Sequence, residues 1–142
     1  MPNSDPGNKT FFKMINNYTE NNENAISFPS LGQLRYLSCL KQVDAVVGNS
    51  SSGLLEAPSL NVPTVNIGNR QKGRLMAKSI INSEPVSKSI IKAIGKVYKN
   101  EFKKQMLKNK NPYEGFETIK KIISILDEIN FQQFSIKEFF DL

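Results

Sequence analysis

The 142-residue sequence has no histidine, no tryptophan and one cysteine. Without histidine it lacks the side chain that most often acts as a general base or a metal ligand, and one thiol excludes an internal disulfide. We expect Cys39, in a segment of helical periodicity, to be a buried packing thiol, because no histidine exists to activate it. The sequence indicates no catalytic residue, no metal ligand and no cofactor site.

Long apolar runs are also missing. No stretch approaches the roughly 20 apolar residues of a membrane span, and residues 1–10 are polar where a secretion signal would be apolar. We therefore expect a cytoplasmic protein without membrane contact. Its length and its 39% hydrophobic content suit one domain, expected over residues 1–130, followed by an aromatic tail at 131–142. That tail either closes the core of the domain or docks on a partner.

The net charge of +6 is unevenly distributed. Residues 1–71 are neutral, so the whole excess lies in 72–142. A lysine face, defined here as the five lysines that recur at helical spacing, carries much of it: Lys88, Lys92, Lys96, Lys99 and Lys103. The run has no arginine, no glycine-rich spacing and no interleaved aromatic residues that face the lysines, so we interpret it as a solvated helix face and do not expect a nucleic-acid partner.

What the sequence does contain is an alternation of short apolar strands and amphipathic helices. The helices are expected at residues 8–22, 33–42, 53–59, 84–99, 101–108 and 117–129, and the strands at 25–28, 43–47 and 63–67. This order predicts the α/β class, with a parallel sheet flanked by helices. Ligands of such sheets bind beyond the carboxyl ends of the strands.

Two loops follow expected strands at that edge. The first reads Gly-Asn-Ser-Ser-Ser-Gly over residues 48–53 and enters a helix, where unpaired backbone N–H groups and hydroxyls can hold phosphate oxygens. Glu56, one turn later, can accept hydrogen bonds from a ribose diol. The second loop supplies Arg70, Lys72 and Arg74 as countercharge. Together the loops predict a nucleotide diphosphate site. Taken singly, the same residues also have structural explanations: a serine can cap the helix, Glu56 can offset the helix dipole, and the basic residues can form a solvated loop.

Both loops resemble those of the UDP-N-acetylglucosamine 2-epimerases, in particular the hydrolysing branch that serves sialic-acid-type sugar synthesis. The motifs typical of the non-hydrolysing branch, Asp-Ser-Gly-Gly and Glu-Arg-Pro-Glu, do not occur here. Residues 1–5 and 111–113 resemble the hydrolysing branch as well. The resemblance implies a two-domain, GT-B-type enzyme with two Rossmann-like halves, of which this chain corresponds to the C-terminal one.

The resemblance also implies roles for six residues in binding UDP. It places Ser50 and Ser51 at the phosphates, Glu56 at the ribose and Arg70 near the diphosphate. The uridine end is assigned to Asn3 and, more weakly, to Ser30.

The resemblance limits what the chain can do alone. The family's acid and base groups come mostly from its N-terminal half, so we expect this chain to bind UDP or a UDP-sugar and to need a complementary N-terminal chain for catalysis. A non-catalytic UDP-sugar-binding module and a basic interaction protein are the alternatives from other classes. A glycosyltransferase of the same architecture is disfavoured by the second loop, residues 70–74, which looks epimerase-like.

Overall fold

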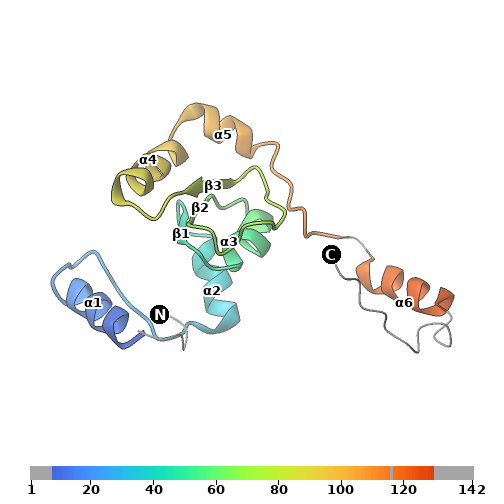
Figure 1. Cartoon of the computed structure of the whole chain (residues 1–142), viewed down its shortest axis with the longest axis horizontal. Coiled ribbons are helices and arrows are strands. Elements are labelled where there is room, and N and C mark those ends of the chain that lie inside the picture. Colours follow the sequence, from blue (N-terminus) through green and yellow to red (C-terminus); the bar gives the residue numbers. More distant parts are fainter. Residues whose placement is uncertain (1–7, 116, 130–142) are drawn as a thin grey trace, which may run out of the picture.

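The computed structural model describes residues 8–115 and 117–129. Its centre is a parallel sheet of three strands in the order β1-β2-β3 (Figure 1). The strands are β1 (Val46–Gly48), β2 (Thr64–Ile67) and β3 (Ile80–Ser83). The helices are α1 (Asn8–Glu20), α2 (Gly32–Leu40), α3 (Ser52–Leu55), the 3-10 helix η1 (Ala57–Leu60), α4 (Ser87–Val97), α5 (Asn100–Met106) and α6 (Thr118–Glu128). The α/β prediction is confirmed.

Helices cover both faces of the sheet. Val65 of β2 is fully buried and packs with Ala93 and Val97 of α4. The neighbouring β2 residue, Thr64, points to the opposite face, because successive strand residues alternate. There its hydroxyl donates to the carbonyl oxygen of Gly53 in α3 at 2.9 Å. The sheet is therefore a layer between α3 and α4, a Rossmann-like arrangement.

Two strand predictions differ from the structure. Residues 25–28 form no strand, and Ile26 is 77% exposed. Apolar composition alone does not make a strand, and this segment joins no sheet ladder within the described residues. By contrast, Ile80–Ser83, which the pattern did not indicate, is β3 and pairs with β2 in parallel. Its apolar part is only the pair Ile80 and Ile81, too short to show a strand period.

The prediction that Cys39 is buried is wrong, because its side chain in α2 is exposed. In the same helix Leu40 is buried, but Leu34 is 80% exposed. Only the C-terminal end of the apolar stripe of α2 is therefore buried. The periodicity predicted that the segment is a helix but not which of its side chains are buried. α1 and α6 lie apart from the sheet in Figure 1, and no residue of α6 is buried.

Two regions of the sequence predictions lie outside the described residues. They are Asn3, expected at the uridine end, and the aromatic tail at 131–142. Of the helices that the structure describes, none has the length and apolar character needed to traverse a bilayer.

Candidate functional site

The serine-rich loop begins where β1 ends. Ser50 and Ser51 precede α3, which is a single turn, and the amide N–H groups of Gly53 and Leu54 are already bonded to the carbonyl oxygens of Ser50 and Ser51. The Ser50 hydroxyl accepts the Ser52 amide N–H at 3.4 Å. No described residue accepts a hydrogen bond from the amide N–H group of Ser50 or of Ser51. The loop thus offers two backbone donors, the exposed Ser50 hydroxyl and the half-buried Ser51 hydroxyl to an anion.

The basic loop begins where β2 ends, and Gly68 and Gly73 turn it with positive φ angles of 72° and 85°. The side chains of Arg70, Lys72 and Arg74 are exposed, so an anion in solution can reach them. None of the three forms an ion pair with a described residue. Their charge is therefore available to a ligand.

Gln71 joins the two loops. Its side chain is 3% exposed, and its Nε2 donates to the carbonyl oxygen of Asn49 at 2.7 Å. This bond places the basic loop directly beside the serine-rich loop. Sequence reasoning missed Gln71, because an uncharged residue between Arg70 and Lys72 carries no signal of its own.

Glu56 and Ser30 line one pocket, although 26 positions separate them in the sequence. This Glu56 pocket has a volume of about 650 Å³ and is lined by Phe28, Pro29, Ser30, Leu31, Gly32, Gln33, Tyr36 and Glu56. The Tyr36 hydroxyl hydrogen-bonds the Ser52 hydroxyl, which connects the pocket to the serine-rich loop. The pocket combines aromatic side chains with an exposed carboxylate.

Asn111 supports the turn that carries Glu56. It is 8% exposed, and its Nδ2 donates to the carbonyl oxygen of Leu55 at 2.8 Å and to the Ser59 hydroxyl at 2.7 Å. Its Oδ1 accepts the Tyr113 amide N–H at 3.0 Å. The Asn-Pro-Tyr segment therefore has a structural role beside the site, one that sequence reasoning did not assign.

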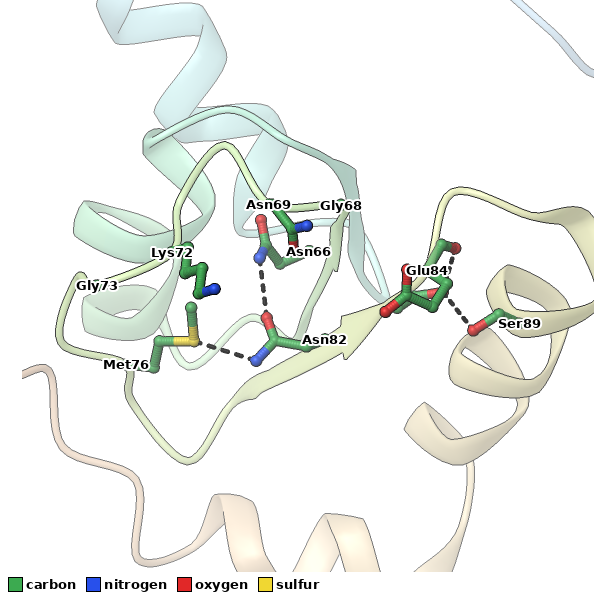
Figure 2. Close-up of a pocket in the computed structure, with 10 residues that line it drawn as sticks. Asn66, Gly68, Asn69, Lys72, Gly73, Met76, Asn82, Glu84 and Ser89 are labelled. Atoms are coloured by element: carbon green, nitrogen blue, oxygen red, sulfur yellow. Dashed lines mark hydrogen bonds between the residues drawn. The ribbon is translucent and has the colours of Figure 1, made fainter.

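A second, more polar pocket lies at the carboxyl ends of β2 and β3 (Figure 2). This asparagine pocket has a volume of about 370 Å³ and is lined by Asn66, Gly68, Asn69, Lys72, Gly73, Met76, Asn82, Ser83, Glu84 and Ser89. No group of three histidine, cysteine, aspartate or glutamate residues within 8–115 and 117–129 could hold a metal ion. The chemistry available here is hydrogen bonding and charge.

Comparison with known proteins gives one family match. The family model described as UDP-N-acetylglucosamine 2-epimerase matches residues 1–127. A GDP/UDP-N,N'-diacetylbacillosamine 2-epimerase (hydrolyzing) of Campylobacter jejuni is 38% identical over 142 residues, which is 99% of this chain and 36% of that protein. A UDP-N-acetylglucosamine 2-epimerase of Neisseria meningitidis is 39% identical over 93 residues, 66% of this chain and 24% of that protein.

A third relative is more distant. The UDP-N,N'-diacetylbacillosamine 2-epimerase (hydrolyzing) of Legionella pneumophila is 29% identical over 128 residues, covering 90% of this chain and 33% of that protein. The chain thus spans about a third or less of the length of these curated relatives.

Proposed function

Because the chain belongs to the UDP-N-acetylglucosamine 2-epimerase family, we propose that it is the C-terminal, UDP-binding portion of a hydrolysing 2-epimerase. The reaction of the complete enzyme would convert UDP-N-acetylglucosamine and water to N-acetylmannosamine and UDP. Residues 1–130 would form the UDP-binding domain. The chain would be inactive until it meets an N-terminal half.

One observation carries this proposal. The bond from Gln71 to Asn49 holds a loop of backbone donors and hydroxyls beside a loop of three cations, none of which forms an ion pair within residues 8–115 and 117–129. A diphosphate needs both kinds of group, since backbone N–H groups orient its oxygens and cations neutralise its charge. We assign Ser50, Ser51 and Arg70 to the diphosphate.

The Glu56 pocket suits the nucleoside end of the same ligand. Phe28 and Tyr36 offer aromatic surface, and a carboxylate accepts two hydroxyl donors from a ribose diol. Glu56 and Ser30 are therefore proposed at the nucleoside, together with Asn3. The Tyr36–Ser52 bond would link nucleoside recognition to phosphate recognition.

Calorimetric titration of the chain with UDP tests the proposal. We expect saturable binding that Arg70→Ala weakens about ten- to a hundredfold, because a charge-assisted hydrogen bond to phosphate contributes about 1.5–3 kcal/mol. Glu56→Ala should weaken binding as well. Arg35→Ala and Glu23→Ala are the matched controls, since both side chains are exposed and neither lines the Glu56 pocket.

Two results would contradict this assignment. The first is a folded chain that does not bind UDP. The second is UDP affinity that falls equally in the control variants. Salt-sensitive binding of polyanions that survives both Ser50→Ala and Arg70→Ala would instead favour a basic interaction protein acting through its lysine face.

A further inference from the structure

Strand β1 forms one edge of the sheet, because the strand order is β1-β2-β3 (Figure 1). The Val46 amide N–H donates to the Pro63 carbonyl oxygen at 2.8 Å, so the backbone of Val46 faces β2. Successive strand residues direct their backbone groups to opposite sides, so the amide N–H and carbonyl oxygen of Val47 face away from β2. Neither group has a hydrogen-bond partner among the described residues. The outer side of β1 therefore offers a donor and an acceptor to a further strand.

The residues of β1 are those of an interior strand. Residues 45–48 read Ala-Val-Val-Gly, an uncharged run of the kind found inside parallel sheets. Edge strands of natural proteins commonly carry charged residues or proline, which prevent further pairing. The Val47 side chain is 47% exposed, whereas Val65, its register partner on β2, is fully buried. An apolar strand at an unprotected edge is a pairing site.

The opposite edge strand has different surroundings. Ile80 and Ile81 of β3 line a pocket of about 430 Å³ together with the charged side chains of Lys96, Lys99 and Glu101. Charged side chains beside an edge disfavour the addition of another strand. The edge that lacks this protection is β1.

No described strand pairs with the outer side of β1. Residues 25–28, the apolar segment that precedes α2, form no strand and leave Ile26 largely exposed. Helix α2 leads into β1, and the helices of a parallel sheet pack on its faces. Because Leu34 of α2 is exposed, part of this helix has no sheet beneath it. Both observations agree with a strand that is missing beside β1.

We propose that an apolar strand of the complementary N-terminal chain adds to β1, pairing with the amide N–H and carbonyl oxygen of Val47. The relatives contain polypeptide that can supply this strand, since this chain spans only 36% of the Campylobacter jejuni protein. Main-chain hydrogen bonds give such strand addition its affinity. The added strand would bring the partner beside the serine-rich loop, which begins where β1 ends. The inference rests on the proposed function only in taking the partner to be that N-terminal chain.

Amide hydrogen exchange tests the proposal on the chain alone and on its complex with the co-expressed N-terminal portion of the Campylobacter jejuni relative. The Val47 amide should exchange fast in the chain alone and roughly tenfold or more slowly in the complex, because a new hydrogen bond protects it. The Val46 amide already donates to Pro63, so it should be protected in both samples and serves as the internal control.

Two substitutions of Val47 form a matched pair. Val47→Pro removes the outward N–H without removing a bond to β2, and its ring obstructs the approach of a strand, so it should weaken the complex roughly tenfold or more. Val47→Ile keeps the N–H and an apolar β-branched side chain and should leave the complex unchanged. Circular dichroism and UDP titration of the Val47→Pro chain alone check that its fold is retained.

Three results would overturn the inference: no complex, a complex in which the Val47 amide still exchanges fast, or protection of Val47 in the chain alone that rises with concentration. The last result would mean that the added strand comes from a second copy of the chain. Each of them leaves UDP binding by the chain intact. A protected Val47 in the complex of a chain that does not bind UDP would support strand addition and overturn only the proposed function.

Discussion

Gly53 lies at the closest approach between α3 and the sheet. A Cβ built at this position would be 2.6 Å from Thr64 Cγ2, and both residues are buried. Gly95, in the last turn of α4, has open space around the position of an added Cβ. The two glycines therefore differ in what a single added methyl group would meet.

We predict opposite effects for alanine at these two glycines. Gly53→Ala should destabilise the chain by about 1–3 kcal/mol, because the methyl group overpacks the contact with β2. Gly95→Ala should stabilise it by about 0.5–1 kcal/mol, since alanine loses less backbone entropy in a helix. Urea unfolding followed by circular dichroism measures both changes. Equal effects of the two substitutions would contradict the close packing of α3 on β2.

At the scale of elements, α4 and α6 are both eleven-residue amphipathic helices with different surroundings. α4 buries Ala93 and Val97 against the sheet, whereas α6 buries none of its residues. An isolated helix of this length is marginal in water, because most helical stability comes from packing. The contribution of each helix to global stability should therefore differ.

Proline at an exposed position in the middle of each helix tests this difference. Lys92→Pro in α4 should cost about 3 kcal/mol or more, because it breaks a helix that forms part of the core. Ser124→Pro in α6 should change the free energy of unfolding little while lowering the helical circular dichroism signal. A comparable loss of stability in the α6 variant would mean that α6 packs on the core in solution.

The elements also show which parts of the fold and of the site could be predicted from the sequence. The serine-rich and basic loops could be predicted, because glycine, hydroxyl and charge leave a local signal after an apolar strand. The bond from Gln71 to Asn49 and the pairing of Asn66 with Asn82 could not, since each depends on contacts between segments 16 or more residues apart. The same reason explains the two wrong strand predictions. Whether residues 80–83 or residues 25–28 form a strand depends on a pairing partner elsewhere in the chain, which local composition does not reveal.

At the scale of the whole chain, large apolar side chains remain exposed on α1, α2 and α6. The most exposed include Phe11 at 58%, Met14 at 63%, Leu34 at 80% and Ile119 at 73%. Apolar surface of this extent commonly marks an interface. It agrees with the proposal that a further polypeptide, equivalent to the part of the relatives that this chain does not span, completes the enzyme.

Co-expression tests that expectation. The chain should form a complex with the N-terminal portion of the Campylobacter jejuni relative, and the mixture should release UDP from a UDP-sugar where neither part does so alone. Arg70→Ala should reduce the activity of the mixture, and Arg35→Ala should not. Turnover by the chain alone would contradict its proposed inactivity, and a stable complex without turnover would contradict functional complementation.

The hydrogen bond from Gln71 to Asn49 has a consequence for exchanging parts between relatives. It joins a side chain of one loop to the backbone of the other, so each loop holds the conformation that its neighbour requires. A chimera that receives only the serine-rich loop or only the basic loop of a relative would combine two loops from different proteins, and the contact between them would not be preserved. The two loops are best transplanted together, as a single cassette.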